Sequence, residues 1–175
     1  ALHLLGVGRG DEVITTPNSF VASTAVIIHL GAKPAFVDVL EDQNMDPSKL
    51  KSAITDSTKA IMPVHLSGRM CDMDKIMEIA DQYSIPVVED AAQSIGSKYR
   101  SKSSGSIGNI GCFSAHPLKN LNAFGDAGFL TTNSKEIAEQ AKLLSNHGLK
   151  TRDIVERFGF NSRMDTLQAV ILNYH

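Results

Sequence analysis

The sequence predicts an α/β fold in three layers, with a mostly parallel sheet covered by helices on both faces. Short β-rich runs alternate with helix-like segments along most of the 175 residues, and this alternation is typical of parallel strands joined by helical crossovers. With 42% hydrophobic and 21% charged residues, the chain has the composition of a globular domain that buries one sizeable core.

The first third of the chain predicts a strand, a helix and a second strand. Val13–Thr16 is short and β-rich, and Phe20–Leu30 is apolar nearly all round, as in a buried helix. Gly31 follows at the position where a left-handed residue often ends a helix. Ala35–Val39 is the next expected strand.

Two helices and a strand are expected in the middle of the chain. An Asp-Pro pair opens a short helix that ends at residue 54, because aspartate caps helices and proline suits their first position. Ala60–Val64 is an expected strand. Asp72 or Asp74 then opens an amphipathic helix that runs to Tyr83.

Three further strands are expected at Val87–Asp90, Ile110–Ser114 and Gly128–Thr132. Ser134 is expected to cap a helix that runs to about Ser145. These elements complete one α/β layer system without repeats or low-complexity tracts.

Four other segments have weaker signals. Ser101–Ser106 is expected to be a flexible surface loop, and Asn146–Ser162 a loop punctuated by glycine. Ala1–Gly6 has the pattern of a helix end, and Asp165–His175 has the apolar spacing of a helix that is beginning. We therefore expect the chain to be a fragment of a longer protein.

Charge and cysteine usage exclude several classes of function. A formal net charge of −2 gives no reason to expect nucleic acid or an anionic membrane as a partner. No apolar run approaches the roughly 18 residues of a membrane span. Cys71 and Cys112 lack the spacing of a zinc or redox site, so we expect reduced thiols, no metal and a cytoplasmic location.

Two candidate catalytic residues follow expected strands. Asp90 ends one strand, and Lys119 lies in a loop of small residues and glycine after another. Ligands of open α/β sheets bind beyond the carboxyl ends of the strands. A lysine that forms a Schiff base and a carboxylate that faces the ring nitrogen are what pyridoxal 5′-phosphate (PLP) requires. On pattern alone, a solvated loop lysine and an aspartate that caps the following turn are the alternatives.

An ordered set of motifs spans nearly the whole chain. Its members are Gly10–Ile14, Gly31–Pro34 with Phe36–Asp38, Pro63–Leu66 with Gly68, Glu89–Gln93 with Gly96, Phe113–Lys119 with Gly125-Asp126, His147-Gly148 and Gly159–Met164. Together they resemble the DegT/DnrJ/EryC1/StrS aminotransferases, fold-type I PLP enzymes that mostly aminate nucleotide-linked keto sugars. One such motif would be weak, whereas the ordered set is specific.

The resemblance implies a role for each matching residue. Lys119 matches the Schiff-base lysine and Asp90 the partner of the pyridine nitrogen. Gln93 matches a residue beside the ring hydroxyl, Ser114 a donor to the phosphate and Phe20 the aromatic that stacks on the ring.

Four other positions match less clearly. Asn161 corresponds to a residue that reaches the phosphate of the neighbouring subunit's cofactor, which implies a homodimer with a shared site. His116 is a candidate contact to phosphate or substrate, with packing against its neighbours as the alternative. We expect a structural role for His65, and a dimer or substrate-phosphate contact for Arg163.

The resemblance implies a PLP-dependent aminotransferase of amino-sugar biosynthesis, with an amino acid, expected to be glutamate, as donor and a nucleotide-linked keto sugar as acceptor. Gly125–Gly128 is a weak indication of a 3-keto substrate. The alternatives are a sugar dehydratase of the same family, in which histidine replaces the lysine, and a non-catalytic α/β nucleotide-binding or regulatory domain.

Residues 1–175 would then be the cofactor-binding large domain, truncated at both ends. The family's phosphate-binding Gly-Thr pair and its small C-terminal domain would be missing. Whether this chain alone is active stays open.

Overall fold

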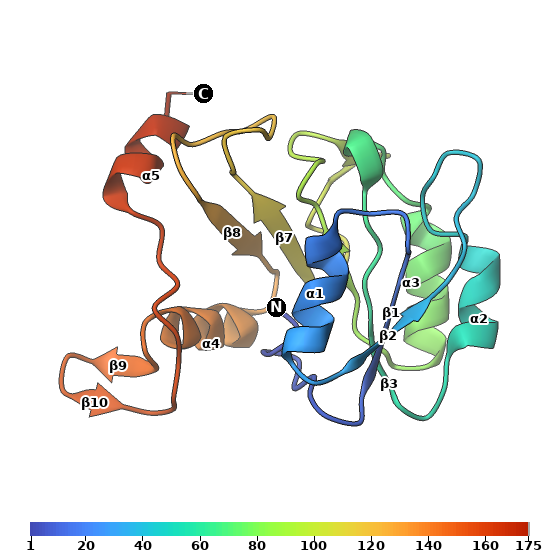
Figure 1. Ribbon diagram of the computed structural model, residues 1–175, viewed down its shortest axis with the longest axis horizontal. Helices are drawn as coiled ribbons and strands as arrows, with labels where there is room; N and C mark the ends of the chain where they lie inside the picture. The colour runs from blue at the N-terminus through green and yellow to red at the C-terminus, as the bar shows by residue number, and fades with distance from the viewer. Residues whose placement is uncertain (175) are drawn as a thin grey trace.

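The computed structural model describes residues 1–174 and contains a six-stranded sheet with helices on both faces (Figure 1). The sheet has the order β2-β1-β3-β4-β7-β8, and its strands are β1 (Glu12–Thr15), β2 (Lys33–Phe36), β3 (Thr58–Ile61), β4 (Val88–Asp90), β7 (Ile110–Ser114) and β8 (Gly128–Thr131). Isolated parallel bridges, Ile61 to Val87 and Val64 to Asp90, join its two halves. All neighbouring strands run parallel except β8, which is antiparallel to β7.

Three of the helical segments begin where the sequence predicts caps. The helices are α1 (Val21–His29), α2 (Leu50–Ala53), α3 (Met73–Gln82), α4 (Lys135–Ser145) and α5 (Thr166–Leu172), and a 3-10 turn, Pro47–Lys49, precedes α2. Asp46, Asp72 and Ser134 each accept a hydrogen bond from a backbone N–H two or three residues later. Gly31 follows α1 with a φ of +76°.

Period-two alternation along the central strands divides the apolar side chains between two cores. Ile14, Ile61 and Val87 belong to a cluster built with α2 and α3, here called the α3-side core. Their neighbours in sequence belong to a second cluster with α1, here called the α1-side core: Val13, Ala60, Met62 and Val88. The predicted three-layer arrangement is therefore confirmed, because each face of the sheet has its own hydrophobic core.

Two predictions of irregular structure were wrong. Residues 98–103 form a hairpin of β5 (Lys98–Tyr99) and β6 (Lys102–Ser103), and residues 149–155 form another of β9 (Leu149–Thr151) and β10 (Ile154–Val155). The β6 residues are exposed, as expected of a surface segment, but Ser104 and Gly105 after them are buried, since Gly105 packs directly on Gly111 of β7, where any side chain would overlap it.

Strand ends also differ from the predictions. β2 and β3 end three residues before the expected Ala35–Val39 and Ala60–Val64 do, because their pairing with β1 ends at Phe36 and Ile61 although the apolar residues continue. Beyond Ile61 the chain continues in an isolated bridge, Val64 to Asp90.

The ends of the chain follow the expected patterns as far as they are described. Val7 N–H donates to the Leu2 carbonyl and Gly6 N–H to the His3 carbonyl, with Gly6 at a φ of +74°, which is the hydrogen-bond pattern of a helix C-terminus. The predicted helix over residues 165–175 is α5, and His175 lies outside the described residues. Within residues 1–174, every helix is too short or too polar to span a lipid bilayer.

Candidate active site

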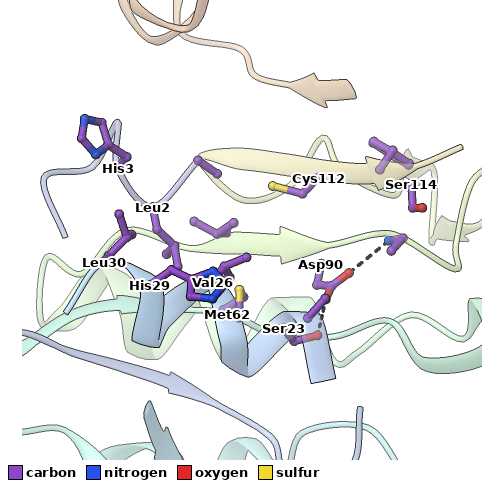
Figure 2. Close-up of a pocket in the computed structure, with 15 residues that line it drawn as sticks. Leu2, His3, Ser23, Val26, His29, Leu30, Met62, Asp90, Cys112 and Ser114 are labelled. Carbon is purple, nitrogen blue, oxygen red and sulfur yellow. Dashed lines mark hydrogen bonds between the residues drawn. The ribbon is translucent and has the colours of Figure 1, made fainter. Parts of the chain in front are cut away.

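Asp90 ends β4 at the carboxyl edge of the sheet, with its side chain on the α1 face. Its backbone N–H donates to the Pro63 carbonyl (2.9 Å) and its carbonyl accepts from His65 N–H (3.1 Å). Its carboxylate accepts from the Ser23 hydroxyl of α1 (2.7 Å) and from Ala92 N–H (3.2 Å). Figure 2 shows Ser23 and Asp90 pointing toward each other, with Ser114 close by on β7. The carboxylate is thus held in one orientation by two donors.

A cavity of about 380 Å³ opens beside this carboxylate. Six of the seven residues predicted to bind the cofactor line it: Phe20, Asp90, Gln93, Ser114, His116 and Lys119. They come from the start of α1, the turn after β4 and the loop after β7. The volume lies in the range of sites that bury a small cofactor.

Lys119 is half-buried in the loop that joins β7 to β8. The loop folds back on itself, since Ala123 N–H donates to the Ala115 carbonyl (2.9 Å) and the Asn122 amide to the Lys119 carbonyl (3.0 Å). Gln168 of α5 accepts from Phe124 N–H (2.9 Å). None of the ion pairs among residues 1–174 uses the Lys119 ammonium, which leaves it available to the cavity.

Ser114 and His116, which also line the cavity, supply hydrogen-bond donors. The Ser114 hydroxyl oxygen accepts from His116 N–H (3.3 Å), so its proton can be donated to a ligand. His116 accepts from Leu118 N–H at Nδ1 (3.2 Å), which leaves Nε2 to carry the ring proton. Phe20 stands at the start of α1 with 67% of its surface exposed, and its ring can therefore cover a flat ligand.

A second cavity of about 430 Å³ also borders Asp90 (Figure 2). Its walls are largely apolar, with Leu2, Val26 and Met62 among them. Burial raises the pKa of the Cys112 thiol in this wall to about 11, so the thiol stays protonated at neutral pH. Because Lys119 lines only the first cavity, we assign the candidate active site to that one.

Asn161 does not line either cavity. It is exposed, and its side-chain oxygen accepts from the Nε of Arg163 (3.0 Å). Arg163 borders a neighbouring hollow with Asp126 and Ala127, two residues that also line the candidate site. A contribution of Asn161 to a neighbouring subunit stays a prediction.

His65 and Glu89 form a buried polar pair behind the site. Their side chains are fully buried and lie 2.9 Å apart, from His65 Nε2 to Glu89 Oε2. Glu89 also accepts from three backbone N–H groups, those of Gly105, Ile107 and Gly108, at 2.6–2.8 Å. Burial by itself raises the pKa of Glu89, but these four hydrogen bonds outweigh it and lower the pKa below its ordinary value.

Sequence reasoning missed three supporting residues: Ser23, Glu89 and Gln168. Ser23 carried a usable signal, because a serine on the buried face of an apolar helix requires a polar partner. Glu89 also carried one, as an acidic residue directly after the apolar pair Val87-Val88 in an expected buried strand. Gln168 carried none, since its partner lies 44 residues away in a loop.

The sequence model of the DegT/DnrJ/EryC1/StrS aminotransferase family matches residues 1–175. A "Pleiotropic regulatory protein" of Geobacillus stearothermophilus is 47% identical over 174 residues, which are 99% of this chain and 47% of the relative. The "UDP-2-acetamido-2-deoxy-3-oxo-D-glucuronate aminotransferase" of Pseudomonas aeruginosa is 47% identical over 169 residues, 96% of this chain and 47% of the relative. The chain thus spans about half the length of these curated relatives.

Solved structures show the same fold. DesV of S. venezuelae, in complex with a ketimine intermediate, superposes with a TM-score of 0.95 at 41% identity, over 99% of this chain and 47% of the other. NtdA of Bacillus subtilis, with bound cofactor PMP, superposes with a TM-score of 0.91 at 40% identity, over 98% of this chain and 39% of the other.

Proposed function

Since this chain belongs to the DegT/DnrJ/EryC1/StrS aminotransferase family, we propose that its protein transfers an amino group from an amino acid, glutamate, to a nucleotide-linked keto sugar. One observation carries the proposal: the carboxylate of Asp90 and the amine of Lys119 line the same cavity. The Pseudomonas aeruginosa relative is named for a UDP-linked 3-oxo sugar, and this supports a 3-keto substrate, as Gly125–Gly128 does.

The residues of the cavity fit PLP. They supply an amine, a carboxylate held by two donors, a hydroxyl with a proton to donate and an exposed aromatic ring. When bound, PLP is an electron sink that stabilises negative charge on the carbon next to the reacting nitrogen.

Lys119 and Asp90 would have different roles in the reaction. Lys119 would hold the cofactor covalently through its Nζ until the amine of the amino donor displaces it, and the freed Nζ would then be the base that takes the proton from the donor's α-carbon. Asp90, fixed by Ser23 and Ala92 N–H, holds a proton on the ring nitrogen. Losing a preorganised charge of this kind costs on the order of 3 kcal/mol in the transition state. Asp90→Asn should therefore lower the turnover rate more than it lowers the affinity for PLP.

A second candidate function has one specific observation in its favour, the name "Pleiotropic regulatory protein" of the Geobacillus stearothermophilus relative. A regulatory domain of that kind would not need the Lys119 amine. The presence of lysine rather than histidine at this position also speaks against the dehydratase alternative.

Absorbance spectroscopy separates these functions. The purified chain, incubated with PLP and dialysed, should keep the visible absorbance of bound PLP, and glutamate should then bleach it. Lys119→Ala should lose the retained colour, whereas Lys102→Ala, which changes an exposed lysine of β6, should keep it. If the chain stays colourless, or if Lys119→Ala retains the same absorbance, the aminotransferase assignment is wrong for this chain.

We also infer a homodimer in the cytoplasm, with residues 1–175 as the cofactor-binding large domain. Large apolar side chains in the loop after β7 and in the segment before α5 support the dimer, since Leu118, Phe124 and Phe158 are 87%, 80% and 97% exposed. Asn161 lies outside this chain's own cavity and would reach that of the partner. For the protein that contains this domain, light scattering after size-exclusion chromatography should give twice the mass of its own polypeptide chain.

A further inference from the structure

The segment Pro63–Gly68, conspicuous in the sequence, contributes no lining residue to the candidate site. The segment nevertheless contacts Gln93, which does line the site. Ser67 has a left-handed backbone, with φ +53° and ψ +27°, and its N–H donates to the side-chain oxygen of Gln93 at 2.8 Å. A non-glycine residue with such a φ is uncommon and requires support from its surroundings.

The buried His65–Glu89 hydrogen bond supplies part of that support. His65 Nδ1 accepts from Cys71 N–H (3.2 Å), so the proton of the ring is on Nε2, which donates to Glu89. Since Glu89 is bonded to three N–H groups of the neighbouring loop, the imidazole is fixed at both nitrogens. This fixes the start of the turn that carries Ser67.

The rest of the turn is held by two polar side chains. Asn44, which is 2% exposed, accepts from Leu66 N–H (3.2 Å) and donates to the Arg69 carbonyl (3.1 Å). The Ser97 hydroxyl donates to the Gly68 carbonyl (2.7 Å). The Ser67 N–H group therefore has little freedom to point elsewhere.

This geometry decides which end of the Gln93 amide is available. A backbone N–H can only donate, so the atom that faces Ser67 is the amide oxygen. No hydrogen bond among residues 1–174 uses the Gln93 NH₂ group, and Gln93 lines the candidate site. The NH₂ group of Gln93 is thus the hydrogen-bond donor that this side chain offers to the cavity.

We propose that Pro63–Gly68 is a positioning element for Gln93: Ser67 N–H holds the amide oxygen, and the NH₂ group donates to an acceptor oxygen of the ligand. The positioning by Ser67 is the new inference. It rests on the proposed function insofar as the acceptor is the ring oxygen of PLP, the contact that the resemblance implies for Gln93. His65 and Glu89 do not line the cavity and act through the turn, because their hydrogen bonds hold the start of it.

The hydrogen bond from Ser67 can be tested without cofactor, by amide hydrogen exchange followed by NMR. In Gln93→Ala the Ser67 amide should exchange about tenfold faster, the effect of one lost hydrogen bond. In Gln93→Glu it should stay protected, because a carboxylate oxygen can still accept, and Gln82→Glu, an exposed change of the same kind, should leave it unaltered. Equal exchange in wild type and Gln93→Ala would overturn the proposal.

The orientation of the amide toward a ligand is tested by comparing dissociation constants for PLP and for 3-deoxypyridoxal 5′-phosphate, which lacks the ring hydroxyl. Wild type should prefer PLP by about tenfold, the value of one hydrogen bond to a charged group. Gln93→Glu should abolish or reverse the preference, because its carboxylate has no proton to donate. An unchanged preference in Gln93→Glu refutes the donor role, whereas failure of wild type to bind PLP refutes the proposed function and leaves the exchange result standing.

Discussion

Replacing Glu89 by glutamine should destabilise the fold, although the two side chains have nearly the same shape. The carboxylate accepts four hydrogen bonds, two at each oxygen: His65 Nε2 and Gly105 N–H at one, Ile107 and Gly108 N–H at the other. In either orientation of a glutamine amide, its NH₂ group faces two of these donors. Each buried donor left without an acceptor costs about 1–3 kcal/mol, while a neutral amide is less costly to bury than a carboxylate. We therefore expect a net loss of about 3 kcal/mol.

Urea denaturation followed by circular dichroism measures this loss. With a slope of about 2 kcal/mol per molar urea, the midpoint should fall by about 1.5 M. Glu139→Gln is the matched control, because its side chain is 62% exposed and lies 3.8 Å from Lys135; it should cost less than about 0.5 kcal/mol. A loss below about 1 kcal/mol in Glu89→Gln, at an unchanged slope, would show that the four contacts do not stabilise the carboxylate as reasoned.

Further predictions concern pH, packing, thiols and the active-site loop. Because the folded-state pKa of Glu89 is below its ordinary value of 4.5, its contribution to stability should be present above that pH and be lost as the pH falls through the folded-state value; stability curves of Glu89→Gln should lack this component. Gly105→Ala should cost about 3 kcal/mol in urea denaturation, since φ is +73° and the new methyl group would overlap Phe113, whereas Gly10→Ala, at φ +92° in open space, should cost about 1 kcal/mol. Burial raises the pKa of Cys71 to about 12 and that of Cys112 to about 11, so a disulfide reagent at pH 8 should label neither thiol in the folded chain and both in denaturant. Gln168→Ala should speed hydrogen exchange of the Phe124 amide about tenfold with little change in global stability, and unchanged exchange would show that α5 does not hold the loop.

Local chemistry explains what the sequence predicts well. Asp46, Asp72 and Ser134 are caps whose partners lie within three residues, so their roles are visible in a short window. The strands that meet at the candidate site were likewise predicted, because apolar runs that end on polar residues mark the carboxyl edge of a buried sheet.

Long-range contacts explain what the sequence does not predict. Ser23 and Asp90 are 67 residues apart, and nothing near either one indicates the other. The hairpin that contains Lys102 depends on the close packing of Gly105 against Gly111, which a window of polar residues does not reveal. Composition there is typical of a surface loop, and Lys102 is indeed exposed, whereas tertiary packing buries Ser104 and Gly105 directly after the hairpin.

The alternation of side chains in β4 limits how the length of this chain can change. Val88 and Asp90 face α1 and Glu89 faces the opposite side, so deleting one residue within the strand would turn a carboxylate to the wrong face of the sheet. Either Glu89 would leave its four hydrogen-bond donors or Asp90 would leave the candidate site, depending on which side of the deletion keeps its place. Insertions and deletions compatible with folding are therefore expected in exposed turns, such as the one between β9 and β10, and not in a strand of three residues.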